Sequence, residues 1–276
     1  MNIERLAAFC NGDRGGNPAG VAICASLPDS EEMQAVAAKV GYSETVFAAP
    51  TGKHWRVRYF SPEIEIPFCG HATIALGALL AARRCGGVQK LVLNDAEVCV
   101  EGFCDGNGMA AALQSPAANS RPAATELVTQ TLRLFGYQES DLDARFPPAR
   151  AWAGNEHLVL ALRTRALLSR MSYDLDAGRA FMLRAGLTTV SFIVCETPQL
   201  FHARNPFASG GVYEDPATGS AAAALAGYLN DVAWPSMGTI EILQGEDMGM
   251  PSRIGVEMRD LPNRSVRVFG RVRPLS

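Results

Sequence analysis

Short apolar segments separated by polar turns run along most of the chain, and several alternate with the period of two that is typical of β-strands. Residues 30–40 and 124–135 instead have helical spacing, with Ser30 as the expected N-cap of the first helix and Gly136 at the end of the second. Residues 174–183 predict a further helix. We expect strands at 3–9, 19–24, 43–48, 55–60, 91–93, 97–101, 109–114, 156–162, 189–195, 240–243, 253–258 and 265–273. Short, closely spaced strands with few helices predict an α+β chain.

Two similar blocks, each with a glycine as its second residue, lie 149 positions apart. The first covers residues 69–80 (CGHATIALGALL) and the second covers 218–229 (TGSAAAALAGYL), so Gly70 corresponds to Gly219. Each block continues as an apolar, alanine-rich run, which favours a buried helix because alanine loses no side-chain entropy. We therefore expect a buried helix to begin at each glycine.

The start of such a helix can bind an anion. Its first N–H groups have no partner within the helix, and the helix dipole makes this end positive. Two such helix starts, one in each half of the chain, predict a cleft between two similar domains that grips a small anion. The alternative is an old duplication in which both helix starts are merely capped.

Composition fits a two-domain globular protein. The chain has 276 residues, of which 48% are hydrophobic, and a net charge of −3, so nothing indicates binding to nucleic acid or to a membrane. Residues 115–124, rich in Ser, Pro, Ala and Asn, are the expected linker. We find no signal peptide or membrane-spanning apolar run, and the scattered 7 cysteines favour reduced thiols in a cytoplasmic protein.

The sequence lacks the motifs that bind nucleotides, flavins, pyridoxal phosphate or metals, so we expect no cofactor. Cys99 and Cys104 are near enough in sequence to suggest a metal site. However, no companion pair of Cys or His has the spacing of a zinc site. Apolar cysteines on a strand are the simpler interpretation.

Glu44 is a candidate acid or base because it stands in an apolar and aromatic segment, residues 41–47. Burial among such neighbours would raise the pKa of a carboxyl group toward neutrality. A pKa near the working pH is what general acid–base catalysis requires. The alternative places Glu44 on the solvent face of an edge strand.

His71 and Asp215 are the titratable groups beside the two glycines, and either could orient a carboxyl group, polarise a substrate oxygen or carry a proton. Either could instead only satisfy a helix end. Thr218 and Ser220 could donate to a bound carboxylate or act as caps, and Ser220 lacks the Gly-x-Ser-x-Gly elbow of a serine nucleophile. Cys69 could be a thiolate at a helix start, although its counterpart is Thr218.

Several motifs, in this order along the chain, resemble those of the PhzF family of phenazine biosynthesis. They are residues 16–21 (GNPAGV), 43–47 (SETVF), 58–62 (RYFSP), 67–73 (PFCGHAT) and 214–221 (EDPATGSA). The resemblance extends from about Phe9 to the last expected strand, and PFCGHAT and EDPATGSA are its most specific strings.

The resemblance implies the fold of diaminopimelate epimerase, in which two pseudo-symmetric α+β domains each wrap a curled, mostly antiparallel sheet around a central helix. It places residues 1–118 and 262–276 in the N-terminal domain and residues 119–261 in the C-terminal domain, with the active site between them. This agrees with the internal repeat. The resemblance also implies a homodimer.

The PhzF enzyme isomerises trans-2,3-dihydro-3-hydroxyanthranilate without a cofactor. Carried over by position, Glu44 would be the acid/base that removes one proton and returns it elsewhere. The resemblance implies that His71, Asp215 and Ser220 assist it. The implied substrate-binding residues are Asn17, Cys69, Gly70, Thr218 and Gly219.

The chain departs from the epimerase relatives, which use one cysteine in each half, because Thr218 stands where a second cysteine would be needed beside Cys69. We therefore predict a cofactor-independent isomerase that moves a proton on a small carboxylate-bearing substrate through a single glutamate. The alternatives are a cysteine-dependent amino-acid epimerase or racemase and a catalytically silent protein that binds small carboxylates. The reaction type transfers better than the substrate.

Overall fold

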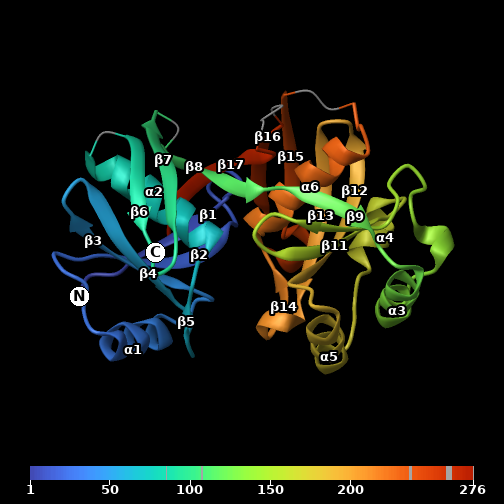
Figure 1. Ribbon diagram of the computed structural model, residues 1–276, viewed down its shortest axis with the longest axis horizontal. Coiled ribbons are helices and arrows are strands. Elements are labelled where there is room, and N and C mark those ends of the chain that lie inside the picture. Colours follow the sequence, from blue (N-terminus) through green and yellow to red (C-terminus); the bar gives the residue numbers. More distant parts are fainter. Residues whose placement is uncertain (85, 107, 236–237, 259–262, 276) are drawn as a thin grey trace. The chain divides into compact units, whose positions relative to one another are not determined.

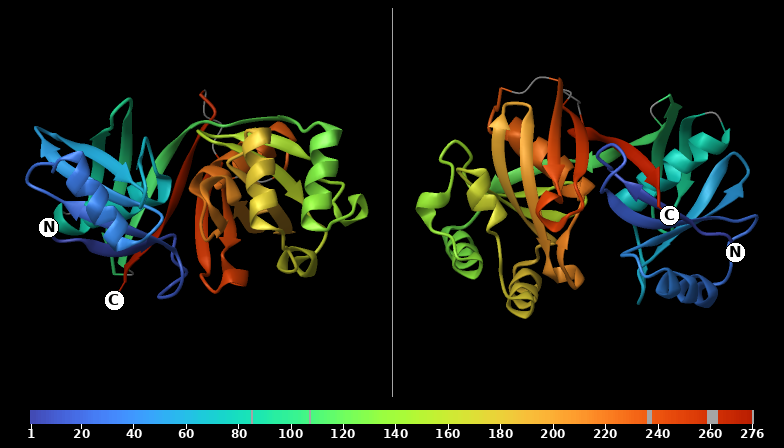
Figure 2. Two further views of the ribbon diagram at one scale, coloured as in Figure 1. Left: turned by 90° about the horizontal axis from the view of Figure 1, so that it is seen from below. Right: turned by 180° about the vertical axis from the view of Figure 1, so that it is seen from behind.

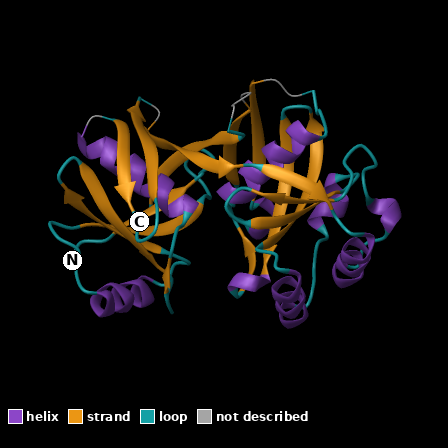
Figure 3. Cartoon of the chain, in the orientation of Figure 1, coloured by secondary structure: helices purple, strands orange, loops and turns teal. Residues whose placement is uncertain are grey.

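The computed structural model describes residues 1–84, 86–106, 108–235, 238–258 and 263–275, and the chain divides into two compact units (Figure 1). Unit 1 comprises Met1–Gln114 and Phe269–Ser276, so it contains both chain ends (Figure 2). Unit 2 comprises Ser115–Val268. Strands predominate in each unit (Figure 3). The predicted domain boundary between residues 261 and 262 lies outside the described residues.

Unit 1 is a sheet around one central helix. Its elements are β1 (Glu4–Ala8), β2 (Asn17–Ile23), α1 (Ser30–Val40), β3 (Thr45–Thr51), β4 (His54–Phe60), β5 (Glu65–Ile66), α2 (Gly70–Arg84), β6 (Gly87–Val92), β7 (Glu97–Asp105), β8 (Gly108–Ala117, which continues into unit 2) and the end of β17 (Ser265–Pro274). Neighbouring strands follow the order β17, β1, β2, β3, β4, β6, β7 and β8. Pairs β2–β3 and β4–β6 are parallel, and the others in this series are antiparallel.

Helix α2 packs directly on β7, and it also contacts β1 and β2. A Cβ atom on Gly102 of β7 would collide with the carbonyl oxygen of Gly77 and lie 2.6 Å from the Cβ of Ala81. The helix and the strand therefore meet at their backbones, which only glycine allows at this point. This close approach explains why the apolar run after Gly70 is built from small residues.

Unit 2 also combines strands and helices. Its elements are β9 (Asn119–Pro122), α3 (Thr125–Phe135), β10 (Ala149–Trp152), β11 (Glu156–Ala161), α4 (Arg165–Ser169), α5 (Leu175–Ala185), β12 (Thr189–Thr197), β13 (Leu200–Phe207), β14 (Val212–Asp215), α6 (Gly219–Asp231), β15 (Gly238–Gln244) and β16 (Ser252–Met258). Strands pair in the order β9, β10, β11, β12, β13, β15 and β16, with β11–β12 and β13–β15 parallel. Helix α6 contacts β9, β10 and β16, and a Cβ on Gly227 would lie 2.6 Å from that of Ala118.

Two local predictions were wrong. Asp29, not Ser30, is the N-cap of α1, because the Asp29 carboxylate accepts a 2.8 Å hydrogen bond from the N–H of Glu32. Glu44 is not part of a strand, because β3 begins one residue later. Residues 115–124, the expected linker, start where unit 2 starts; they contribute to β8 and form β9, which pairs with β10.

Within the described part of the chain, no helix combines the length and the apolar character that crossing a membrane requires. Each cysteine there is a free thiol.

His157 is a fully buried histidine in β11, and burial lowers its pKa to about 3. Its Nδ1 lies 2.7 Å from Thr189 Oγ1, and its Nε2 is buried without a hydrogen-bond partner among the described residues. A positive charge here would have no compensation, so the ring is neutral in the folded protein.

We expect His157 to make the protein acid-sensitive. Below pH 6.5 the unfolded chain binds a proton on this ring that the folded chain does not bind until about pH 3, so stability falls as the pH falls. At a pH about two units below 6.5 the loss is about 2–3 kcal/mol of unfolding free energy. Urea titrations at a series of pH values across this range measure the unfolding free energy. In His157→Asn this free energy should fall less steeply with decreasing pH than in the wild type. The control His54→Asn, at an exposed position, should keep the wild-type pH dependence of the unfolding free energy. An unchanged pH dependence in His157→Asn would contradict the prediction.

Candidate active site

In unit 1, Glu44, His71, Cys69 and Asn17 meet at the start of α2. Cys69 directly precedes the helix and His71 is its second residue, whereas Asn17 begins β2 and Glu44 stands just before β3. Parallel pairing of β2 with β3 explains the meeting, because the N–H of Gly20 in β2 donates a 3.1 Å hydrogen bond to the backbone carbonyl of Glu44. The sequence motifs are thus brought together by backbone pairing.

The side chain of Glu44 is 15% exposed, so most of it is buried. Its Oε2 atom lies 3.2 Å from Nε2 of His71, which is ion-pair distance, but the groups are not aligned as a hydrogen bond. Oε2 is buried without a hydrogen-bond partner among the described residues. A buried carboxylate oxygen whose lone pairs are uncommitted is rare, and it suits a group that takes up a proton.

The other side of the His71 ring faces Asn17 and Cys69. Nδ1 lies 3.3 Å from Asn17 Nδ2 and 3.4 Å from Cys69 Sγ. Because an amide nitrogen only donates, Nδ1 accepts from Asn17, and the ring proton of neutral His71 is then on Nε2, beside Glu44. His71 therefore lies between the carboxylate and the thiol, with Cys69 Sγ nearer to Nδ1 than to Nε2, which is 3.9 Å away.

The backbone before α2 is fixed by Thr73, which is fully buried. Its hydroxyl donates to the carbonyl of Cys69 at 2.6 Å, and its N–H donates to the same oxygen at 3.0 Å. Tyr59 must then donate its own hydroxyl proton to Thr73 Oγ1, 2.7 Å away. Burial raises the pKa of Tyr59, so it keeps this proton at neutral pH.

Glu44, Cys69 and His71 also form a possible metal-ligand set, because one donor atom of each lies within 4.8 Å of the others. Oxygen, sulfur and nitrogen donors in this combination are those that zinc accepts. We expected no metal from the sequence, and that remains a prediction. The same three residues supply acid–base and thiol groups, so a metal would compete with that chemistry.

In unit 2, Asp215, Thr218, Gly219 and Ser220 form the turn from β14 into α6. Thr218 is at the N-cap position but makes no side-chain cap; instead its hydroxyl donates to Asp215 Oδ2 at 2.6 Å. Gly219 and Ser220 are the first residues of α6 and are half-buried, as is Asp215. The Thr218 proton is thus committed to Asp215 and not to a ligand.

Gln244, at the end of β15, was missed by the sequence analysis and is 1% exposed. Its Nε2 donates to the carbonyl of Asp215 at 2.6 Å and to Thr218 Oγ1 at 3.0 Å. Its Oε1 accepts from the N–H of Thr218 at 3.3 Å. The next residue, Gly245, has φ of 77°, and a Cβ there would lie 2.8 Å from the carbonyl of Pro216. The sequence holds little signal for Gln244, because β15 also contains the polar residues Thr239 and Glu241.

Behind this turn lies a buried ion pair. Arg204 donates to both carboxylate oxygens of Glu214, at 3.0 and 2.5 Å, and its other nitrogen donates to the carbonyls of Leu168, Ser169 and Met171. Burial alone would lower the pKa of Arg204, but the hydrogen bonds and charge of Glu214 raise it. Glu214 directly precedes Asp215, so this pair anchors β14 where the turn begins.

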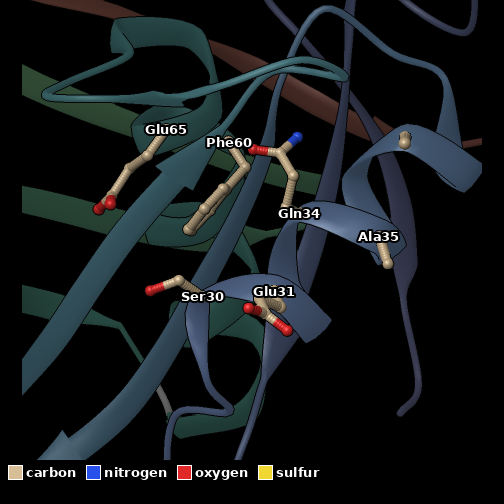
Figure 4. A pocket seen from close by; sticks show the side chains of 7 residues that line it. Ser30, Glu31, Gln34, Ala35, Phe60 and Glu65 are labelled. Atoms are coloured by element: carbon tan, nitrogen blue, oxygen red, sulfur yellow. The ribbon is translucent and has the colours of Figure 1, made fainter.

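Unit 1 also has a surface hollow of about 520 Å³ between α1 and the strand residues Phe60 and Glu65 (Figure 4). Glu31 and Gln34 of α1 line it as well. None of the predicted site residues does, so we do not assign the reaction to it.

The structure thus groups the predicted residues in two clusters. Cluster 1, in unit 1, consists of Asn17, Glu44, Cys69, Gly70 and His71. Cluster 2, in unit 2, consists of Asp215, Thr218, Gly219 and Ser220. The cleft between the two halves stays a prediction.

Comparison with known proteins gives a family match over nearly the whole chain. The model of the phenazine biosynthesis-like protein family (PhzC-PhzF) matches residues 6–273. A protein of Deinococcus radiodurans described as an uncharacterized isomerase is 31% identical over 262 residues, covering 92% of this chain and 85% of that protein.

Solved structures show the same mixed fold of strands and helices. A PhzF-family phenazine biosynthesis protein from Bacillus anthracis superimposes with a TM-score of 0.87 at 22% identity, covering 100% of this chain and 98% of the other. A predicted epimerase of Pseudomonas aeruginosa, PA4716, gives a TM-score of 0.84 at 27% identity, covering 99% and 96%.

Proposed function

Since the chain belongs to the phenazine biosynthesis-like protein family, we propose that it is a cofactor-independent isomerase that moves a proton on a small carboxylate-bearing substrate. Glu44 is the acid/base of this reaction. The observation that carries the proposal is the buried Oε2 atom of Glu44, which has no hydrogen-bond partner among the described residues. The relative described as an uncharacterized isomerase supports the reaction class.

The proposed step needs no oxidant. Glu44 Oε2 takes a proton from a substrate carbon, and the electron pair of the broken C–H bond delocalises into the substrate. The carboxyl group exchanges its proton with solvent and then returns a proton to another carbon. His71 lies beside the reacting carboxylate, with its Nε2 atom 3.2 Å from Glu44 Oε2. Asp215 and Ser220 assist in holding the substrate.

Anion binding is proposed at the helix starts. The free N–H groups of the first turn and the helix dipole favour a carboxylate there. Gly70 begins α2 and Gly219 begins α6. We propose that the two halves of the chain are related, and the matching alternation of antiparallel and parallel pairs through β1–β7 and β10–β16 supports this.

A cysteine-dependent epimerase is the second candidate, favoured by the 3.4 Å distance from Cys69 Sγ to His71 Nδ1. A histidine at this distance can activate a thiol. However, a two-thiol mechanism needs a second cysteine, and the corresponding residue is Thr218, whose hydroxyl is engaged by Asp215 and Gln244.

We test the proposal by solvent exchange. Wild-type protein is incubated in D₂O with trans-2,3-dihydro-3-hydroxyanthranilate and, in parallel, with a panel of small α-amino and aromatic carboxylates, and proton NMR follows carbon-bound deuterium. The proposal expects exchange of one carbon-bound proton that Cys69→Ser retains within about tenfold, because the acid/base is not the thiol. Loss of all exchange in Cys69→Ser would favour the epimerase, and no exchange by wild type on any compound would leave a silent binding protein.

A further inference from the structure

Gln244 belongs to a chain of buried polar side chains in unit 2. Beyond its contacts to the turn, its Oε1 accepts from Asn205 Nδ2 at 2.9 Å, and Asn205 Oδ1 lies 3.4 Å from Thr189 Oγ1. Thr189 in turn lies 2.7 Å from Nδ1 of His157. Gln244, Asn205, Thr189 and His157 are each at most 2% exposed. Four polar side chains in an apolar core cost free energy unless each is paired. Packing alone therefore does not account for this series of side chains.

Two backbone groups fix the orientation of Gln244. The carbonyl of Asp215 can only accept, so the side-chain atom facing it is the NH₂ group; the N–H of Thr218 can only donate, so the atom facing it is the oxygen. Both conditions agree. The side chain of Gln244 therefore cannot be reversed without losing both bonds.

The orientation of Gln244 fixes the direction of the other hydrogen bonds in the series. Because Gln244 presents its oxygen, Asn205 presents its NH₂ group there and its own oxygen to Thr189. The Thr189 hydroxyl donates to that oxygen and must accept from His157, which places the histidine proton on Nδ1. The unpartnered Nε2 and the lowered pKa of His157 agree with this neutral form.

In the other direction the chain ends on a carboxylate. Gln244 Nε2 donates to Thr218 Oγ1, so the Thr218 hydroxyl has its own proton free to donate to Asp215 Oδ2. All donors thus point one way, from His157 to Asp215. Hydrogen bonds in such a series polarise one another in a low-dielectric interior, and each strengthens the next.

We propose that Gln244 is a positioning residue of the active site, which holds the turn of residues 215–219 in place and keeps Asp215 Oδ2 as a hydrogen-bond acceptor. The role of Gln244 in catalysis rests on the proposed function, in which Asp215 assists. The role of Gln244 in holding the turn is independent of that function. Gln244 touches the backbone on both sides of Pro216 and Ala217, and this clamps the residues from which α6 starts.

The first test measures the turn without any substrate. Amide hydrogen exchange of Thr218, followed by NMR, should become at least about tenfold faster in Gln244→Met, because methionine keeps the size but removes the acceptor. The amide of Leu225, inside α6, should keep its rate. Tyr228→Phe is the matched control, since it removes a buried hydrogen bond of α6 to the carbonyl of Pro147 and spares the turn.

Gln244→Glu gives a signature that general destabilisation does not produce. A protonated glutamate can donate to the carbonyl of Asp215 as the amide does. The ionised form keeps an acceptor for the Thr218 N–H but has no donor, and repulsion from the carbonyl and carboxylate of Asp215 moves it away from the turn. Protection of the Thr218 amide, relative to that of Leu225, should therefore recover in this variant as the pH is lowered, while wild type and Gln244→Met show no such recovery.

The proposal would be overturned if Thr218 kept its wild-type protection in Gln244→Met, or if the ratio of Thr218 to Leu225 protection in Gln244→Glu did not depend on pH. If Gln244→Met does not fold, the pH series of Gln244→Glu decides alone. These outcomes are independent of turnover, so a wrong proposed function would leave them unchanged. If both proposals are right, solvent exchange into the substrate also slows in Gln244→Met, by at least about tenfold, and not in Tyr228→Phe.

Discussion

Replacing Glu44 by glutamine is expected to slow solvent-deuterium exchange into the substrate by about 10²–10⁴-fold, the range that a general acid–base group contributes. Glutamine has the same shape and fits beside His71, so the backbone anchored on Gly20 should not move. Its amide does not take up a proton at neutral pH. The variant therefore removes the proton acceptor without opening the site.

The matched control is Glu63→Gln, which removes one negative charge from an exposed position of the same unit. It should exchange at the wild-type rate. Both variants should unfold at the wild-type urea concentration within a few tenths molar, so that any loss is one of chemistry. Exchange by Glu44→Gln at the wild-type rate would remove Glu44 from the mechanism.

Replacing Arg204 by methionine should destabilise unit 2 by about 3–5 kcal/mol, because Glu214 is left buried without its partner. The side chains of Arg204 and Glu214 are 8% and 3% exposed. Arg204 also satisfies the last carbonyls of α4, among them Ser169. A loss of this size is a large share of the stability of a typical domain.

Urea unfolding followed by tryptophan fluorescence measures this effect. In a Trp55→Phe background the remaining tryptophans, Trp152 and Trp234, lie in unit 2 and report on it alone. Adding Glu214→Leu to Arg204→Met should recover much of the loss, since no buried charge then remains.

Arg253→Met is the control for this series. It breaks an exposed pair with Glu241, whose side chains are 49% and 44% exposed, and should cost less than about 1 kcal/mol. An equal loss of unfolding free energy in Arg253→Met and Arg204→Met would show that the buried ion pair stabilises the protein no more than the exposed one.

Sequence patterns predicted the helix starts and ends that are determined by residues close together in the sequence. The glycine blocks gave helices beginning at Gly70 and Gly219, and Gly136 ends α3 as expected. The error at the start of α1 arose because Asp29 and Ser30 are neighbours and both are good N-caps. In the structure it is the Asp29 carboxylate that accepts from the N–H of Glu32. Residues 115–124 have the composition of a linker, but their backbone pairs with strands distant in sequence, which composition does not reveal.

The polar partners of the site were beyond sequence reasoning. His157, Asn205 and Gln244 each stand in or at the end of a strand that also contains other polar residues, so none of them can be told from an ordinary surface position. Only the alignment of β11, β12, β13 and β15 brings them into one line. For the same reason Glu44 could be selected as a candidate, but its distance to His71 could not be predicted.

The return of β17 to unit 1 has a consequence for biosynthesis. β1 pairs with β17 at Leu6 and Pro274, so β1 must wait for a strand that is synthesised long after it. Unit 2 is continuous in sequence and can complete its pairings earlier, which makes the N-terminal half the later one to mature. Meanwhile the open edge of β1 can recruit a neighbouring nascent chain, so chaperone demand should concentrate on the N-terminal half.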